Sequence, residues 1–417
     1  MMKTERKEQH MLQKPEVLAP AGDFERLISA VQYGADAVYL GGKAFGMRAT
    51  PANFDEEELK RAVEYAHKHG VKVYLTCNTL PRNNEIEYFP DYIRYAEQIG
   101  IDACIANDIG VLMMLKEHAP GMEIHISTQA GIVNYQTARA FYELGAKRVV
   151  LARELSLEEV AQIREKTPPE LEIEVFVHGA MCMSVSGRCL ISNYLVDRDA
   201  NRGECAQPCR WGYHLVEEKR PGQYYPVFED EAGSYILNAK DLCMIEYIDK
   251  LAKAGVTSLK IEGRAKSAYY VAVVTNAYRC AVDQFWNDPE HFNLEPWLLE
   301  EVKKVSHRRY STGFYFGKPD QYYENGGYLR EYDVVAVVDA CENGWMYATQ
   351  KNKLSIGEKV EILSPRAKPV VMKIESLFDD EGNPVDSTPH PHMRFRIQTE
   401  VVVPPGSMIR KARKDGE

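Results

Sequence analysis

The sequence predicts an α/β protein: a (β/α)8 barrel of the TIM type with a cysteine-rich insertion, followed by a small C-terminal antiparallel β-barrel. A unit of helix, glycine and short apolar strand recurs along the first two thirds of the chain. From about residue 330 the pattern changes to period-two alternation with short turns, which is typical of antiparallel strands. The predicted parts are an N-terminal arm at 1–14, the barrel at 15–305 with its insertion at 180–256, a linker at 306–329 and the C-terminal domain at 330–417.

The repeated unit places a glycine between a helix and each of five strands. Glycine fits the left-handed conformation that often ends a helix, because it has no Cβ. The apolar run that follows suits a parallel strand with helices over both flanks, and three further runs lack the glycine. In chain order the eight predicted strands lie in PEVLAP (15–20), YGADAVYLGG (33–42), HGVKVYLTCN (69–78), IGIDACIAND (99–108), MEIHISTQA (122–130), LGAKRVVLARE (144–154), LEIEVFVHG (171–179) and AGVTSLKIEGR (254–264).

The stretches between these strands are long enough for one helix each. Residues 55–69 and 157–166 carry apolar side chains at i, i+3 and i+4 spacing, which is typical of an amphipathic helix. Eight such units in one run favour a closed barrel. An open doubly wound sheet is the alternative, because a sequence pattern does not reveal closure.

Composition and charge narrow the class of protein. The 417 residues exceed one ordinary domain, and 45% hydrophobic with 27% charged residues is typical of a globular chain. No apolar run approaches the roughly 20 residues that span a bilayer, and the charged first residues lack the apolar segment of a secretion signal. We therefore expect a cytoplasmic protein without a membrane partner. With a net charge of −10, any nucleic acid must bind through local basic patches.

Polar side chains follow nearly every predicted strand. In barrel enzymes the reacting groups gather at the carboxyl ends of the strands, although loop polarity and helix caps explain single residues about as well. The arginines are more informative, because a guanidinium binds a carboxylate or phosphate through two hydrogen bonds. A dianionic small molecule or an RNA phosphate is the expected ligand. The predicted substrate-binding residues are Arg48, Asn78, Asn107, Gln129, Arg153 and Arg264.

A dense group of cysteines marks the insertion. In a reducing compartment such a group is more often metal-binding than disulfide-bonded, and thiolates suit zinc or an iron–sulfur cluster. The C-x2-C pairs of zinc ribbons are absent, which favours a cluster, and so is the C-x3-C-x2-C run of radical enzymes. The five cysteines are Cys182, Cys189, Cys205 and Cys209, followed by Cys243 in NAKDLC.

Other active-site motifs are missing from the sequence. It has no H-E-x-x-H, G-x-S-x-G, P-loop or G-x-G-x-x-G pattern, so a hydrolase with a standard triad or zinc site has no support. His178, just before the cysteines, and Glu262, at the end of the last barrel strand, are the candidate acid–base residues. A hydrogen-bonding role at the barrel rim explains His178 equally well.

The segment EVFVHGAMCMSVSGRCLIS (174–192) closely resembles the collagenase-like peptidase family U32. PEVLAPAGD, RDANRGECAQPCRW, NAKDLC and TGFYFG resemble the family as well, so the likeness extends over nearly the whole chain. The family signature E-x-F-x2-G-[SA]-x-C-x4-G-x-C-x-x-S is matched at Glu174, Phe176, Gly179, Ala180, Cys182, Gly187, Cys189 and Ser192.

This resemblance implies a function other than proteolysis, because several members of the family are RNA or quinone hydroxylation factors. It implies prephenate-dependent formation of 5-hydroxyuridine at the wobble position of tRNA, without molecular oxygen as the source of the hydroxyl group. It also implies a 4Fe-4S cluster. Carried over by motif, its ligands are Cys182, Cys189, Cys205 and Cys243, with Cys209 as the alternative fourth ligand.

If tRNA is the substrate, the wobble base must leave its stack to enter the pocket. Arg198, Arg202 and Arg210 then supply positive charge beside the cluster, and the basic stretch at 410–414 contacts phosphate elsewhere. The alternatives are hydroxylation of ribosomal RNA cytidine or a quinone, a collagenase-like peptidase, and a non-catalytic RNA-binding protein. Quinone-type relatives act as pairs, so a related family subunit is a further possible partner.

Overall fold

The structure is a computed structural model that describes residues 12–45, 53–181, 240–317, 319 and 329–413. Within the insertion it describes residues 195, 196, 198 and 206 and the backbone of two short strands, β8 (His214–Leu215) and β9 (Tyr225–Pro226), which pair in antiparallel fashion. The predicted N-terminal arm lies almost entirely outside the described residues.

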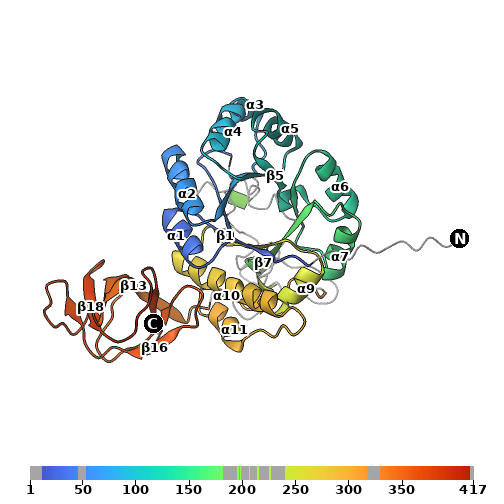
Figure 1. The fold of residues 1–417 in the computed structure, drawn as a ribbon. Coiled ribbons are helices and arrows are strands. Elements are labelled where there is room, and N and C mark those ends of the chain that lie inside the picture. The colour runs from blue at the N-terminus through green and yellow to red at the C-terminus, as the bar shows by residue number, and fades with distance from the viewer. Residues whose placement is uncertain are drawn as a thin grey trace.

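Eight parallel strands of the described chain close into a barrel, which confirms the predicted fold class (Figure 1). Closure is made by β11, which pairs with β1 through Ser258 and Glu16 and with β7 through Ser258 and Glu174. Every predicted strand is present. The strands are β1 (Glu16–Pro20), β2 (Ala37–Leu40), β3 (Lys72–Cys77), β4 (Ala103–Ala106), β5 (Glu123–Ile126), β6 (Arg148–Val150), β7 (Glu172–Gly179) and β11 (Ser258–Ile261).

Helices surround the barrel on its outer side, as Figure 1 shows. Side-chain caps start several of them, for example the reciprocal capping box of Asp55 and Glu58. All five repeated glycines have positive φ, between 72° and 105°, so the predicted left-handed ends are confirmed. The helices are α1 (Phe24–Gln32), α2 (Glu56–Lys68), α3 (Asn83–Ile86), α4 (Phe89–Gln98), α5 (Ile109–His118), α6 (Tyr135–Glu143), α7 (Leu157–Glu165), α9 (Ile248–Lys253), α10 (Ala268–Asn287) and α11 (Pro296–Lys303).

Two short strands extend the barrel sheet where the insertion leaves it. β10 (Asp241–Cys243) pairs antiparallel with the end of β7, and β12 (Tyr310–Ser311) pairs parallel with β10. The pair Gly179–Leu242 therefore holds the two ends of the insertion together. The stretch at 306–329, predicted to be a linker, contributes β12 to the rim of the barrel.

The C-terminal domain is a curled antiparallel sheet, which agrees with the predicted class. Its order is β16-β15-β19-β13-β14-β18-β17, and alternate side chains of these strands form a separate apolar core. The strands are β13 (Tyr332–Glu342), β14 (Trp345–Gln350), β15 (Lys359–Leu363), β16 (Val370–Lys373), β17 (Phe378–Asp379), β18 (Arg394–Gln398) and β19 (Met408–Ala412).

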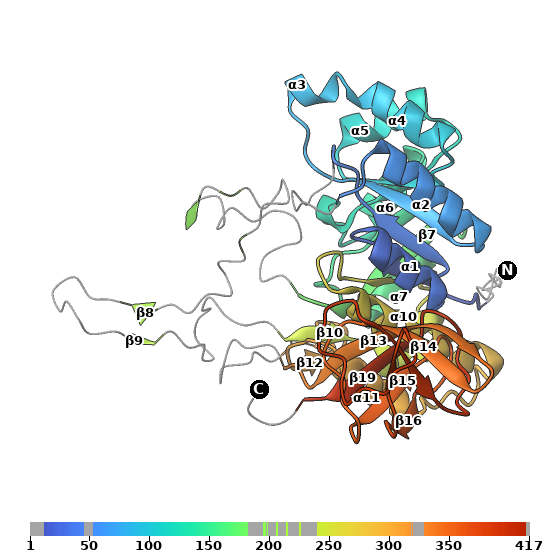
Figure 2. The same cartoon turned by 90° about the vertical axis from the view of Figure 1, so that its left-hand side faces the viewer.

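This domain lies against α1, α10 and α11, and Figure 2 shows it beside the barrel wall. Arg410 of β19 has no exposed surface and donates hydrogen bonds to Glu301 of α11 and Glu361 of β15. Arg413 is bonded to Asp333. The expectation that the basic stretch at 410–414 contacts RNA is therefore wrong for Arg410, which joins the two domains. A basic sequence pattern does not reveal whether its side chains are buried.

No helix among the described residues is both long and apolar enough to cross a bilayer.

Replacing Arg410 by Met is expected to lower the free energy of unfolding by about 3–5 kcal/mol, because the buried carboxylate of Glu301 loses both hydrogen bonds from Arg410 and keeps only Lys304 at 3.6 Å. Urea denaturation measures this change. The matched control is Arg413→Met, whose ion pair with Asp333 is partly exposed and should be worth roughly 0–1 kcal/mol. Equal losses in the two variants would contradict the assigned role of Arg410.

Candidate active site at the barrel mouth

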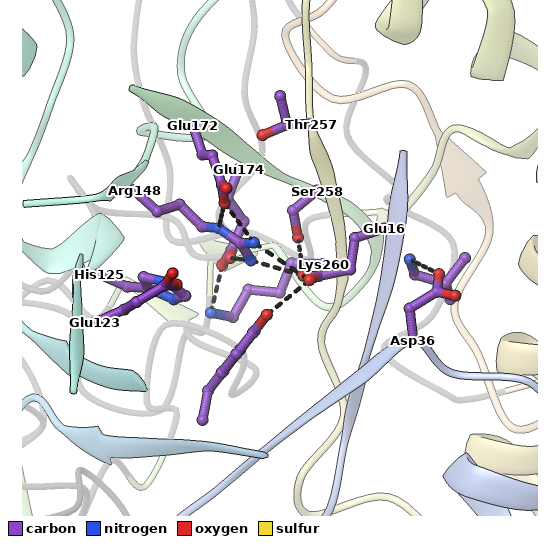
Figure 3. A network of polar contacts seen from close by, with 12 residues as sticks. Glu16, Asp36, Glu123, His125, Arg148, Glu172, Glu174, Thr257, Ser258 and Lys260 are labelled. Atoms are coloured by element: carbon purple, nitrogen blue, oxygen red, sulfur yellow. Dashed lines mark hydrogen bonds and ion pairs between the residues drawn. The ribbon is translucent and has the colours of Figure 1, made fainter. Parts of the chain in front are cut away.

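One side of the barrel lumen is charged, and Figure 3 shows the network. Glu16, Arg148 and Ser258 are the first residues of their strands and lie at the amino-terminal end of the lumen. Arg148 donates to Glu16 at 2.6 Å and to Glu174 at 3.1 Å. Glu174, with no exposed surface, also accepts a hydrogen bond from Lys260 at 2.7 Å. The charges thus form a continuous path from Glu16 up to Lys260.

Ion pairing keeps the buried carboxyls of this network ionised. Burial raises the pKa of Glu174, but the charges of Lys260 and Arg148 outweigh it, so the pKa is lowered overall. Burial likewise raises the pKa of Glu16, and Arg148 outweighs it. His125 lies in the same lumen, and burial followed by the charge of Arg148 holds its pKa well below the ordinary value. An apolar cluster adjoins the network, and the hydroxyl of Tyr74 in this cluster donates to Glu16. The cluster consists of Leu18, Ala37, Tyr39, Tyr74, Ala103 and Ile105.

Phe176 forms the next layer toward the carboxyl ends of the strands. The Arg153 guanidinium lies 3.7 Å from the centre of its ring, and the Lys260 ammonium lies 5.5 Å from the same point. Arg153 donates to the carbonyl of Ala180 at 2.7 Å and lies 3.7 Å from the Glu262 carboxylate. Two cations and one carboxylate therefore meet around a single aromatic ring at the mouth of the barrel.

Arg264 reaches the same mouth from the loop after β11. Its Nη1 donates to the hydroxyl of Thr76 at 3.1 Å, and that hydroxyl donates to the carbonyl of Leu40. Two glycines allow this approach. A Cβ at Gly41 would lie 2.3 Å from Nη1 of Arg264, and one at Gly22 would lie 2.0 Å from the carbonyl oxygen of Arg264. The predicted residues Arg153, Glu262 and Arg264 are thus brought to one face of the barrel.

His178 is buried behind β7 and does not lie at the open rim, where an acid–base residue would be expected. β7 carries one extra residue, Val177, because Lys260 pairs with Phe176 while Ile261 pairs with His178. Such a bulge turns the following side chain to the other face of the strand. His178 is 1% exposed and packs against Tyr278 of α10 and Tyr310 of β12. Burial, with smaller effects of nearby cations, lowers its pKa to about 3, so the ring is neutral at physiological pH.

Cys243 is the one candidate cluster ligand within the described part of the chain. It lies in β10, opposite His178, and is 8% exposed. Burial raises the pKa of its thiol to about 12. Metal binding removes such a proton, and β10 places this thiol where the insertion rejoins the end of β7. Cys243 therefore fits a ligand role.

The remaining predicted polar residues follow neighbouring strands. Asn78 follows β3, Asn107 follows β4, and Gln129 lies in the turn after β5. Asn107 has a buried Oδ1 without a hydrogen-bond partner among the described residues, and a buried acceptor of this kind is suited to a ligand or water. Arg198 is described and exposed. Arg48, Cys182, Cys189, Cys205, Cys209, Arg202 and Arg210 lie outside the described residues.

Sequence reasoning missed Lys260 and Phe176 as parts of the site. A signal for Lys260 was available, because a lysine stands inside the strand SLKI, whose other residues carry no charge. Phe176 was noted only as a signature position. Lys260 lies below Phe176 and is paired with Glu174, so it supports the ring from inside the lumen. Arg153 and Arg264 are the two cations at the mouth, and together they can hold an anion with two carboxylates.

Glu174→Gln should lower the free energy of unfolding at pH 7 by about 3–5 kcal/mol, because Arg148 and Lys260 lose their shared buried anion. Since the folded pKa of Glu174 is lowered, its contribution is complete above the unfolded value of about 4.3 and is lost as pH falls through the folded pKa. Urea denaturation from pH 7 to pH 3 should give a flatter acid limb for the variant. Glu123→Gln, at a partly exposed carboxyl, is the control, and an identical profile for Glu174→Gln would contradict the account.

Comparison with known proteins places this chain in a family. The profile of peptidase family U32 matches residues 22–325, and that of the family's C-terminal domain matches residues 330–410. The chain is 37% identical to tRNA hydroxylation protein P1 of Bacillus subtilis, over 96% of this chain and 95% of that one. It is 36% identical to tRNA hydroxylation protein P of Escherichia coli (90% and 92%) and 34% identical to a collagenase of Porphyromonas gingivalis (87% and 89%). The protein therefore belongs to peptidase family U32 and carries the C-terminal domain of that family.

Proposed function

We propose that this protein hydroxylates tRNA, converting the wobble uridine to 5-hydroxyuridine with prephenate as co-substrate and without molecular oxygen. The observation that carries the proposal is the similarity, along almost the whole chain, to two proteins named for tRNA hydroxylation. Arg153 and Arg264 at the barrel mouth support it, because prephenate has two carboxylates. A tRNA substrate also favours the cytoplasm as the place of action.

The chain's own residues would bind and orient the reactants. Arg153 is fixed by Phe176, Ala180 and Glu262, so its planar guanidinium is already oriented for a carboxylate. Arg264 is held by Thr76 on the far side of the mouth and would bind a second carboxylate. Glu262 would keep Arg153 in position and would act as the proton acceptor at the mouth.

A 4Fe-4S cluster held by Cys182, Cys189, Cys205 and either Cys243 or Cys209 would supply electron transfer beside this mouth. Replacing the C5 hydrogen of uridine by hydroxyl is a two-electron oxidation. It balances if prephenate gives up its hydroxyl group to uridine and is itself reduced by two electrons, and a redox group beside the mouth would relay these electrons. His178 would act as a positioning residue, because its buried ring packs behind the β7–β10 pair next to Cys243. Arg198, Arg202 and Arg210 would bind phosphates near the insertion, and a related family subunit is a possible partner.

Deleting the gene should remove 5-hydroxyuridine and its derivatives from cellular tRNA, and wild-type protein should restore them. Cys182→Ala should fail to restore them and should lose iron in the anaerobically purified protein. Of Cys243→Ala and Cys209→Ala, the variant that lacks the fourth ligand should do the same. Nucleoside mass spectrometry and iron analysis measure both effects.

The matched control is Cys341→Ala, a cysteine of the C-terminal domain, which should keep both iron and modification. An unchanged nucleoside profile in the deletion strain, without a redundant paralogue, would contradict the tRNA proposal. Cleavage of gelatin that is lost in Cys182→Ala would favour the collagenase-like activity instead.

Arg153→Lys should raise the KM for prephenate by about tenfold or more, because an ammonium cannot reproduce two charge-assisted hydrogen bonds. Steady-state kinetics on an anticodon stem–loop measures this value. Arg139→Lys, on the exposed side of α6, should leave it unchanged. An Arg153→Lys enzyme with wild-type KM would rule out Arg153 as the carboxylate ligand.

A further inference from the structure

A cavity of about 260 Å³ lies beside the two rim strands, on a surface that the proposed reaction does not use. Its walls combine an ammonium group, two hydroxyls and aromatic rings. The lining residues are Lys240, Tyr310, Ser311, Thr312, Gly313, Phe316, Gly317 and Pro319. A cavity of this volume and polarity is suited to one small anionic or polar group with a flat part.

The loop that forms the cavity is firmly attached to the barrel. The side chain of Tyr315 is buried, and its hydroxyl donates to the carbonyl of Phe176 at 2.7 Å. The backbone carbonyl of Tyr315 accepts from the N–H of Leu157. Gly317 has φ of 131°, a conformation that residues with a Cβ rarely adopt. Because Tyr315 points inward, its neighbour Phe316 is presented outward.

Phe316 is 48% exposed, which is high for a phenylalanine on a well-anchored loop. Its ring contacts Tyr247 at 4.7 Å between centres, with the two ring planes inclined at 60°. The ammonium of Lys250 lies 5.0 Å from the centres of both rings. Glu246 is exposed on the same short segment, so its carboxylate partly offsets the charge of Lys250.

We propose that this cavity and Phe316 bind one unpaired nucleotide of the RNA substrate, with its base stacked on Phe316. The phosphate would lie against Lys240 and the hydroxyls of Ser311 and Thr312, with Lys250 at the edge of the base. Single-stranded nucleic acid is bound in this way, by aromatic side chains combined with cations that follow the backbone. The inference rests on the proposed function, which supplies RNA as the ligand.

The cavity and the barrel mouth share one structural support. Tyr315 bonds to the backbone of Phe176, whose ring carries Arg153. Tyr310 lines the cavity and contacts His178 at the end of β7. Only a few contacts would therefore separate a nucleotide stacked on Phe316 from a base held at the mouth. This nucleotide would hold the RNA in place on one side of the reacting uridine.

Phe316→Ala should raise the Kd for a labelled anticodon stem–loop about tenfold, because the stacking surface is lost. Phe316→Trp should preserve or tighten binding. Lys240→Gln should weaken binding and reduce the slope of log Kd against log salt by roughly one phosphate contact. Fluorescence anisotropy with the anaerobically purified full chain measures all three.

Trp286→Ala is the control, since Trp286 is a similarly exposed aromatic residue on α10. Phe316→Leu, which keeps bulk without a flat ring, serves if the alanine variant does not fold, and it should lose affinity as well. Wild-type affinity in both Phe316→Ala and Phe316→Leu would overturn this site while leaving the proposed function intact. If the wild-type protein itself does not bind the stem–loop, the site and the proposed function are both contradicted.

Discussion

The arrangement of the mouth depends on the buried carboxylate of Glu174. It stands between Arg148 and Lys260 inside the lumen, where an unpaired ion would cost several kcal/mol. Each of its oxygens has a cationic partner, and Arg148 carries the connection down to Glu16 at the start of β1. The pairing joins β1, β6, β7 and β11, the strands that close the barrel. Lys260 is thereby held below Phe176, and the ring of Phe176 supports Arg153 above it.

The rim is built outward from the same strand. The bulge at Val177 directs Phe176 into the lumen and His178 behind the strand, so one segment serves two sides. β10 and β12 then extend the sheet, which brings Cys243, the start of the insertion and the loop of Phe316 to one place. The C-terminal domain is joined on a different side of the barrel through Arg410 and Glu301. Its contribution to the described structure is therefore to brace α10 and α11.

The repeated unit of helix, glycine and strand predicted the barrel, because each unit carries residues that favour its own local conformation. Gly34, Gly70 and Gly145 end helices in the left-handed conformation, and apolar runs follow them. The two-residue strand β12 was missed, because two paired residues leave no periodic signal. The bulge that moves His178 away from the lumen was missed for a related reason. One extra residue turns the following side chain to the other side of the strand, but it leaves the composition of the strand almost unchanged. Arg410 was misinterpreted because charge patterns report residue type and not burial.

The site could be predicted in part. Arg153, Glu262 and Arg264 were found from their positions after strands, since parallel strands bring their carboxyl ends together. To predict the role of Lys260, one must know which side of its strand faces the lumen. Its partner Glu174 is far away in sequence, so the pair gives no local signal. The cluster ligands other than Cys243, together with Arg48, Arg202 and Arg210, lie outside the described residues, so their roles stay predictions.

The central claim is that the cations at the barrel mouth bind the carboxylates of the co-substrate. A crystal structure of the anaerobically prepared protein with prephenate tests it most directly. The account predicts one carboxylate within hydrogen-bond distance of the Arg153 guanidinium, with Phe176 beneath it and Arg264 near the second carboxylate. Prephenate bound elsewhere, with the guanidinium of Arg153 still on Ala180 and Glu262 alone, would contradict it.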